Sequence, residues 1–428
     1  MGMAMAQAQK TYLIGQITSA ELDALSARHP QGNFQQTSNM AALVKPTVKA
    51  VDFVGVRKAA DGSIVAGCMI AYTKGHLGLE GSIWVGPLCD EDDTELLAAM
   101  TRAITVSARK HHAVSVSCWP GQVYMRRTSD GEPDGAADDL AIDNMKRLGW
   151  RHAGFDRGYG SIVNRWVYVK DLSGVSDEKA LLKSYDKRTQ WSVKRASSMG
   201  VHVRELGVGE LGVFADIERQ TAERRGFEYR GEGYFRRFKE AFGGAAHFMV
   251  AEIHVAEYVA DMEAKRDALQ AKVEALQAKQ AQHPTTRTER QLGEETRNLE
   301  AARKRLAEAA EYAGDGDVLP AAASLFVENP RETVYLFSGS VERYKPFYAS
   351  ALIQHWAMLH LCVERGVGRY NFYGISGVFD DPDDEGRGVL EFKQGFNGYV
   401  EELVGEFTLP VSHVRFALMQ GLRKLLKR

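Results

Sequence analysis

Paired cysteines, long apolar stretches and an excess of charge of one sign are all missing from this sequence of 428 residues. Its four cysteines form no Cys-x-x-Cys pair, which excludes a disulfide framework and a cysteine zinc site. No stretch approaches the ~20 apolar residues of a membrane span, and residues 1–10 lack the apolar core of a secretion signal. We therefore expect a cytoplasmic protein.

Charge and histidine spacing narrow the function classes further. Fifty-four Lys and Arg against 56 Asp and Glu leave a net charge of −2, so the surface as a whole is not built for nucleic acid. A basic groove on one domain remains compatible with this sum. No His-Glu-x-x-His spacing occurs, and the acidic run 380–385 lacks the glutamate that position twelve of a calcium loop needs. We predict no metal and no cofactor.

Short apolar runs alternate with helical patterns along most of the chain. Residues 48–56 and 63–72 flank Asp61-Gly62 and predict a hairpin, 82–88 a third strand, and 94–110 a helix before the strand 113–118. The same alternation of strand and helix patterns returns after residue 150. There we expect strands at 166–169, 201–205, 247–255, 322–328, 333–338 and 370–373, with helices over 177–199, 210–225 and 348–365. The pattern predicts two α/β units.

Residues 255–313 differ from the rest of the chain, because glycine and aromatic residues nearly vanish there. Apolar residues recur in steps of three and four over 255–280 and again over 292–313, with His283-Pro284 between the two runs. The spacing predicts an antiparallel coiled-coil arm whose helices of roughly 28 residues reach ~42 Å. We divide the chain into a first domain of residues 1–160 and 410–428, a second of 161–253 and 315–409, and an inserted arm of 254–314.

Several ordered segments resemble the Fem family of aminoacyl-tRNA-dependent peptidyltransferases. These are Tyr-Asn-Phe-Tyr-Gly-Ile-Ser-Gly at 370–377, Phe-Lys-Gln-Gly-Phe at 392–396 and Gly-Glu-Phe at 405–407. Upstream, Arg-Gly-Phe at 225–227, the basic helix 188–201 and Phe-Gln-Gln at 34–36 also match the family's order. The arm lies where family members that have one carry it. The resemblance covers nearly the whole chain.

The resemblance implies an α/β (α+β) fold of two acyl-CoA N-acyltransferase-like (GNAT-like) domains with the inserted arm. It implies transfer of an aminoacyl group from aminoacyl-tRNA, the co-substrate, to the side-chain amine of a lipid-linked or UDP-linked muropeptide, which builds an interpeptide bridge of peptidoglycan. Such domains work mainly by holding the donor against the amine. A homodimer, or a heterodimer with a related transferase, is a further implied partnership.

Lys393 is the first candidate for catalysis. In the family, the lysine of the Phe-Lys-x-Gly-Phe block faces the acyl donor, where a cation stabilises the tetrahedral oxyanion. Without the resemblance, Lys393 would be read as a surface lysine in a loop at a strand edge. Two interpretations stay open for Phe392: it packs against the terminal adenosine of the tRNA, or it belongs to the core.

Three residues resemble the family's acceptor site. Lys45 and Arg230 correspond to a basic pair that holds the diphosphate of the precursor, with ordinary solvated charges as the alternative. If its segment is helical, Tyr234 lies one turn beyond Arg230 and lines the same groove.

Two further residues are weaker candidates. Tyr344 lies where the family has a tyrosine near the acceptor peptide, although a half-buried core tyrosine fits as well. Glu406 either binds the attacking ammonium and helps to remove its proton, or pairs with a nearby lysine.

The remaining predictions concern surfaces. Lys194 and Arg195 either contact the tRNA backbone or form the solvent-exposed face of a helix. The arm serves as a clamp or a dimerisation element. The basic amphipathic segment 414–428 suits either the inner leaflet of a membrane or, the interpretation we favour, packing against the first domain. An N-acyltransferase with another donor and amine, and an adaptor acting through its coiled coil, are the rival functions.

Overall fold

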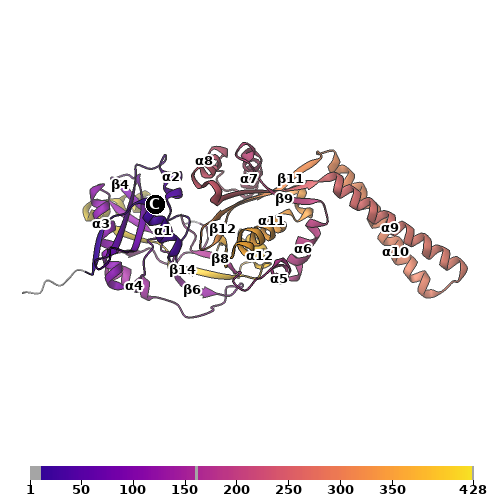
Figure 1. Cartoon of the computed structure of the whole chain (residues 1–428), viewed down its shortest axis with the longest axis horizontal. Helices are drawn as coiled ribbons and strands as arrows, with labels where there is room; N and C mark the ends of the chain where they lie inside the picture. Colours follow the sequence, from indigo (N-terminus) through magenta and orange to yellow (C-terminus); the bar gives the residue numbers. More distant parts are fainter. Residues whose placement is uncertain (1–10, 160–161, 427–428) are drawn as a thin grey trace, which may run out of the picture.

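The computed structural model describes residues 11–159 and 162–426. It has two α/β units side by side and a long helical arm that projects from the second unit (Figure 1). The predicted fold class, two α/β units with an inserted coiled coil, is confirmed.

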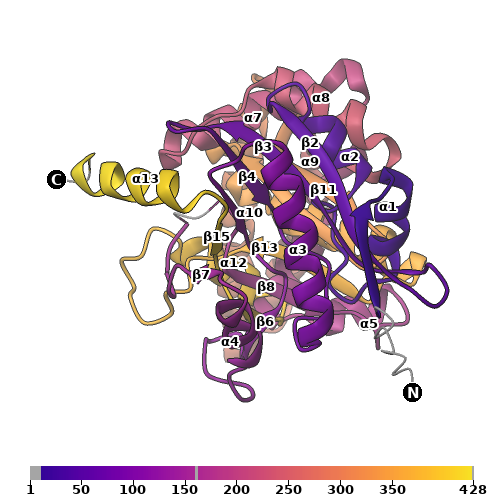
Figure 2. The same ribbon diagram turned by 90° about the vertical axis from the view of Figure 1, so that its left-hand side faces the viewer.

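The first unit is built on one mixed sheet. Its strands, in the order in which they pair, are β1 (Tyr12–Gln16), β2 (Ala50–Lys58), β3 (Ile64–Lys74), β4 (Leu79–Ile83), β5 (Ser115–Cys118), β15 (Phe407–Pro410) and β7 (Arg151–His152). Neighbouring strands of the described part are antiparallel, except that β4 and β5 are parallel. The crossover between these two is α3 (Thr94–Lys110), which lies across one face of the sheet (Figure 2). The other face is covered by α1 (Ser19–Arg28) and α2 (Ser38–Val44).

Local chemistry explains these elements. Asp93 caps α3 by accepting hydrogen bonds from the backbone N–H groups of Glu95 and Leu96. Along β3, Cys68 and Ile70 pack on the α3 side whereas Met69 packs on the side of α1, as the two-residue period of a strand requires. The third strand ends at Ile83, earlier than predicted, because Val85 adopts a positive φ of 44°.

The second unit is built on a larger sheet. Its strands pair in the order β6 (Val123–Arg127), β14 (Tyr399–Leu403), β8 (Trp166–Asp171), β13 (Arg369–Gly374), β12 (Thr333–Ser340), β11 (Val318–Glu328), β10 (Ala246–His254) and β9 (Val201–Glu205). Only β12 and β13 are parallel among the described pairs. One face is covered by α5 (Glu178–Lys183), α6 (Lys187–Ser197), α11 (Ala349–Ala357) and α12 (Arg387–Gln394). On the opposite face, α7 (Leu211–Arg225) and α8 (Glu232–Phe242) cover the part near β9 to β12 (Figure 1).

Each sheet contains one strand that comes from the part of the chain building the other unit. The predicted domain boundaries do not account for these two strands. β6 comes from the first third of the chain but forms the edge of the second sheet, against β14. β15 follows β14 by four residues yet lies between β5 and β7 of the first sheet. The segment that connects the two sheets therefore passes through Gly405, whose φ of 89° favours glycine.

The arm extends the hairpin of β10 and β11. His254 pairs with Val318 at the end of this hairpin. The first arm helix, α9 (Val255–Gln282), begins directly after His254, and the second, α10 (Thr286–Ala313), ends shortly before Val318. Its base is anchored in the core of the second unit through Tyr258, Met262 and Ala309. The helix pair and its break lie where the heptad pattern predicts them.

Two other segments differ in detail from expectation. The helix predicted over 348–365 is α11 followed by a π-helical turn, Met358–Cys362, and a 3-10 turn, Val363–Arg365. The C-terminal α13 (His413–Leu426) packs on the first unit through Phe416 and Met419, which contact Val114. Residues 427 and 428 of the predicted segment lie outside the described part. None of the described helices has the length and apolar character needed to cross a membrane.

Candidate functional site

The parallel strands β12 and β13 separate almost as soon as they pair. Their register holds for only two pairs, Thr333 with Tyr370 and Val334 with Asn371. Beyond this point β13 has an irregularity between Asn371 and Gly374, and Tyr373 has a φ of 64°. A positive φ at a bulky aromatic residue costs backbone energy, and such strain gathers at functional sites. The separation leaves a notch in the second sheet, which we call the β12–β13 notch.

Lys393 lies at this notch. It is carried by α12, not by a strand-edge loop, and only 4% of its surface is exposed. Its Nζ donates to the carbonyl oxygen of Gly374 at 2.6 Å and contacts that of Tyr373 at 3.5 Å. Burial lowers the pKa of Lys393 to about 7. Since both carbonyl oxygens are acceptors, the geometry favours the protonated, donating form of the amine.

Phe392 precedes Lys393 and is half-buried. Its ring lies edge-on to that of Phe396, with 5.4 Å between centroids, and packs on the core that α5, α6 and α11 share. Phe392 thus has one side in the core and another open, which is compatible with both interpretations of its role.

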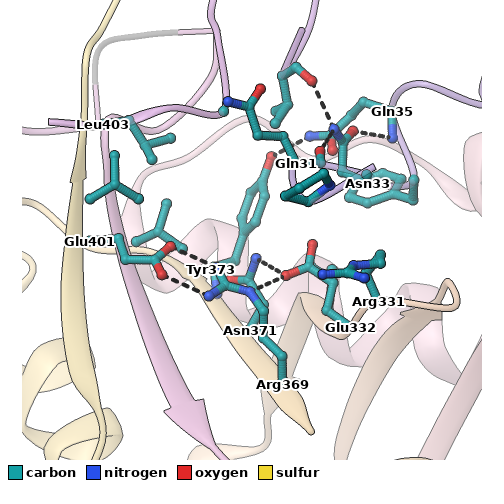
Figure 3. Close-up of a pocket in the computed structure, with 18 of the residues that line it drawn as sticks. Gln31, Asn33, Gln35, Arg331, Glu332, Arg369, Asn371, Tyr373, Glu401 and Leu403 are labelled. Carbon is teal, nitrogen blue, oxygen red and sulfur yellow. Dashed lines mark hydrogen bonds and ion pairs between the residues drawn. The ribbon is translucent and has the colours of Figure 1, made fainter. Parts of the chain in front are cut away.

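A cavity of about 770 Å³ lies on the other face of β13. Its floor comes from strands β8, β12, β13 and β14 of the second sheet, and its far wall from residues 30–35 of the first unit (Figure 3). Asn371 and Tyr373 face this cavity, whereas Tyr370 and Phe372 pack on the face that carries α12. Lys393 therefore does not line the cavity but lies behind its wall, and Tyr373 belongs to both places. We take the notch as the chemical centre, because it holds the buried cation.

Charged groups on the cavity floor are paired with one another. Arg369 bridges Glu332 at 2.9 Å and Glu401 at 2.7 Å, and Asn371 donates to Glu332 at 3.0 Å (Figure 3). By contrast, Arg331 at the rim is exposed and has no ion pair among the described residues. The floor is thus rigid and polar, as a site for a hydrogen-bonding ligand requires.

The first unit holds its wall of the cavity through amide side chains. Gln31 donates to Glu91 and to Gln122, each at 2.9 Å, and Gln35 reaches the hydroxyl of Tyr373 at 3.4 Å. Burial raises the pKa of Glu91 to about 8, so this carboxyl is largely protonated at neutral pH. One oxygen of Glu91 and the amide oxygen of Gln31 are buried without a hydrogen-bond partner among the described residues. A proton on Glu91 avoids a buried, uncompensated negative charge at this position.

The predicted acceptor residues lie where α2 and α8 pack together, outside the cavity. Lys45 directly follows α2 and Arg230 precedes α8, and both are exposed. The Arg230 guanidinium lies 5.8 Å from the ring centroid of Tyr234, on the same side of its segment. Tyr234 packs against Phe235, Phe238 and Phe337, and burial raises its pKa.

Sequence reasoning missed Glu218 beside this group. It lies on α7, is 1% exposed, and neither carboxylate oxygen has a hydrogen-bond partner in the described part of the chain. Burial raises its pKa to about 7, and the charge of Arg230 opposes this shift. Glu218 follows no motif, so only the fold reveals it.

The other predicted residues lie apart. The hydroxyl of Tyr344 donates to Asp315 at 3.2 Å at the base of the arm, where Arg343 also binds Asp315. Glu406 is half-buried in the segment between β14 and β15, and its carbonyl accepts from the backbone of Ala153. Lys194 and Arg195 lie on α6, on the face of the second sheet that carries Lys393.

One group of residues in the described part could hold a metal by its donor set. His202, His254 and Glu257 have ligand atoms within 4.8 Å of one another at the base of the arm. They are already paired, with 2.7 Å between His202 and Glu257, and lie largely in solvent. The group is remote from the notch, and the absence of a metal stays a prediction.

The fold and the notch define a class: two α/β units, one of which holds a buried cation at a break in its sheet. Comparison with known proteins agrees. The model of the FemAB family matches residues 17–424. Aminoacyltransferase FemB of Staphylococcus epidermidis is 30% identical over 349 residues, covering 79% of this chain and 81% of the relative. Aminoacyltransferase FemA of Staphylococcus aureus (strain bovine RF122 / ET3-1) is 27% identical over 423 residues, covering 96% and 98%.

A solved structure supports the same assignment at the level of the fold. The crystal structure of FemX superposes with a TM-score of 0.74 and 21% identity, covering 97% of this chain and 100% of that one. The chain belongs to the FemAB family, and it is an aminoacyltransferase. The predicted family and enzyme class are therefore confirmed.

Proposed function

We propose that this protein transfers an aminoacyl group from aminoacyl-tRNA to the side-chain amine in the stem peptide of a peptidoglycan precursor, and so builds an interpeptide bridge. One observation carries the proposal: the ammonium of Lys393 is buried at the β12–β13 notch, and its hydrogen-bond partners among the described residues are backbone carbonyls. Such a cation, held without a carboxylate partner, is available to a developing negative charge.

The reaction follows from that geometry. The amine nitrogen attacks the ester carbonyl of the donor, a C–N bond forms, and the carbonyl oxygen becomes an oxyanion. Lys393 donates to this oxyanion, which lowers the barrier to its formation. The ester C–O bond then breaks, the ribose oxygen leaves and takes a proton, and an amide remains.

The attacking amine must lose a proton first, because a lysine-type amine has a pKa near ~10.4. Glu406 keeps its proposed role here, as a carboxylate that binds the ammonium or helps to remove its proton. We leave Tyr344 out of the acceptor site, because its hydroxyl is bonded to Asp315 at the arm.

Lys45 and Arg230 are proposed to bind the diphosphate of the acceptor. Phe34 precedes α2 and contacts Phe242, the last residue of α8, with 6.1 Å between ring centroids. From Phe34 the chain runs along α2 toward Lys45, so we expect Lys45 near the start of α8, where Arg230 lies. A point charge from one unit and a guanidinium from the other suit two adjacent phosphates. Lipid-linked and UDP-linked muropeptides share this diphosphate, so both are acceptors to test.

The test uses purified protein, radiolabelled aminoacyl-tRNAs and either a UDP-linked or a lipid-linked muropeptide. Wild type is expected to move label to the precursor, and Lys393→Ala to lower kcat about 100-fold or more, because one donor to the oxyanion is lost. Lys170→Met is the matched control. Lys170 is also buried in the second sheet and donates to a backbone carbonyl, that of Asn397 at 3.3 Å, but not at the notch.

Each outcome decides something different. Full activity of Lys393→Ala would remove the lysine from the mechanism and keep the reaction. Equal losses in the Lys393 and Lys170 variants would point to a folding effect. No transfer from any aminoacyl-tRNA to either precursor would overturn the proposed function.

A further inference from the structure

Helix α6 presents an unusual outer face. Its inner face is buried through Thr189, Ser192, Val193 and Ala196. On the opposite side lies Trp191, which is 53% exposed, far more than a tryptophan in a core.

Four cations surround Trp191 on this helix. Lys187 and Arg188 precede it by four and three residues, and Lys194 and Arg195 follow it by three and four. Residues at these separations are neighbours on a helix surface, so the indole ring lies inside a frame of positive charge. We call these five residues the α6 patch.

The charge of the α6 patch is largely uncompensated. None of its four cations forms an ion pair within residues 11–159 and 162–426. The carboxylate at the start of the helix, Asp186, is occupied as the N-cap and accepts from the backbone of Thr189 at 2.6 Å. Lys194 shares a groove with Glu178 of α5, so one cation of the four has a carboxylate in its surroundings.

The patch lies next to the catalytic segment. The N–H of Asp186 donates to the carbonyl of Gly395 at 3.0 Å, and Asn397 donates to the carbonyl of Ser184, also at 3.0 Å. Both bonds join the start of α6 to the turn that follows α12, two residues beyond Lys393. A ligand that runs along α6 toward this turn therefore approaches Phe392 and Lys393.

A second aromatic ring supports Trp191. Tyr348, the residue before α11, meets it at 5.0 Å between centroids and 79° between ring planes. This edge contact fixes the indole ring while more than half of its surface stays open. An aromatic ring held rigidly among cations is the arrangement that binds single-stranded nucleic acid, because each base has a face to stack and each nucleotide a phosphate.

We infer that the α6 patch binds the unpaired 3′ end of the donor RNA, with a base stacked on Trp191 and the phosphates on the four cations. This inference rests on the proposed function, since it supplies the route by which an aminoacyl-tRNA reaches Lys393. An anionic membrane is the weaker partner. A helix that inserts into a leaflet presents several large apolar residues, whereas Trp191 is the one on the exposed face of α6.

The first experiment measures binding of a deacylated RNA hairpin that ends in an unpaired ACCA segment. Trp191→Ala is expected to weaken binding about tenfold or more, because the stacking partner is lost. Trp191→Phe keeps an aromatic face, so its affinity should stay within a few fold of wild type. Wild type should also show quenching of indole fluorescence on binding, and Trp191→Phe should lose that quenching while it still binds.

Salt dependence tests the cations. For single strands the slope of log K against log salt changes by about 0.7 for each phosphate contact. Lys187→Gln and Lys194→Gln should each reduce the slope by this amount. Lys110→Gln, an exposed lysine on α3 of the first unit without an ion pair in the described part, should leave it unchanged.

Transfer assays separate this inference from the proposed function. If wild type transfers from aminoacyl-tRNA, Trp191→Ala should raise KM for the donor about tenfold with little change in kcat. Unchanged affinity and KM in Trp191→Ala would overturn the inference and leave the function intact. Quenching by phosphatidylglycerol vesicles but not by RNA would also overturn it, in favour of a membrane. Failure of wild type to transfer at all would instead sink the proposed function.

Discussion

The two units share a strand plan but differ in what they bury. Each has a parallel strand pair joined by a helix, β4–α3–β5 in the first and β12–α11–β13 in the second. In the first unit the parallel register holds for four pairs, and the core around it contains the thiols of Cys68, Cys89 and Cys118. In the second it holds for two pairs, and the notch beyond them contains an ammonium.

Buried charged side chains are also distributed unequally between the two units. Up to Trp150, Glu91 is the only acidic or basic side chain among the buried residues described, and its raised pKa keeps it mostly neutral. The described part of the second unit buries seven carboxylate, amine or guanidinium side chains, namely Arg165, Lys170, Glu218, Glu252, Glu332, Lys393 and Glu402. Burying a charge is unfavourable unless it is compensated, so a unit that does this repeatedly has a use for it. The core of the first unit is thus close to neutral, whereas the second unit buries several charged groups, among them the ammonium proposed to take part in catalysis.

Removing Glu402 should have the largest effect on stability. This carboxylate on β14 binds both Arg165 and Arg127. Glu402→Ala leaves the buried guanidinium of Arg165 without its partner, so we expect a loss of about 3–5 kcal/mol in the free energy of unfolding. Urea denaturation measures it. Glu223→Ala, which breaks an exposed pair with Arg219, should have a far smaller effect, because solvent screens the pair. Both pairs lie in the second unit, so equal effects of the two would contradict the conclusion that its buried charges matter more than its exposed ones.

The pH dependence of stability should reveal Lys393. Its folded pKa of about 7 lies below the model value of 10.5, so between these values the unfolded chain binds more protons than the folded one. Stability due to this group therefore rises with pH from about 7 to 10.5, by at most about 1.4 kcal/mol per pH unit. Activity that needs the cation should fall over the same range. Lys393→Met should remove this slope, measured as the difference between the two proteins in urea unfolding, and a slope that persists would locate the proton elsewhere.

Glu91→Gln should have the smallest effect. Below pH 4.5 the acid is neutral in both the folded and the unfolded chain, so replacing it there by an amide whose oxygen accepts from Gln31 should change stability by less than about 1 kcal/mol. Its folded pKa is raised, so wild type gradually loses this contribution as pH rises from 4.5 to about 8. Thermal unfolding across that range should show the decline in wild type and its absence in the variant. A large loss at pH 7 would mean that Glu91 is ionised.

Local patterns account for the parts that the sequence predicts. Heptad spacing gives the arm, because each helix carries its own apolar seam, and the hairpin around Asp61-Gly62 is set by its turn. The Phe-Lys-Gln-Gly-Phe block identifies Lys393, although its helical setting and its burial need the fold.

The features that the sequence does not predict depend on contacts between segments that are far apart in the chain. β6 has five residues and no signal for its partner β14, which lies about 275 positions away. The Glu332–Arg369–Glu401 floor of the cavity assembles from β13, β14 and the residue before β12. Trp191 belongs to no sequence motif. Its candidate role follows only from the structure, in which it lies on the exposed face of α6.

The position of β15 has a consequence for biosynthesis. The first sheet needs Phe407–Pro410 between β5 and β7, so the unit whose strands are translated first is completed only after the strands of the second unit have been translated. Domains commonly fold in order from the N-terminus as they emerge from the ribosome. Here the first sheet has an open position until the last strand of the second unit has been made, so the two units must mature together.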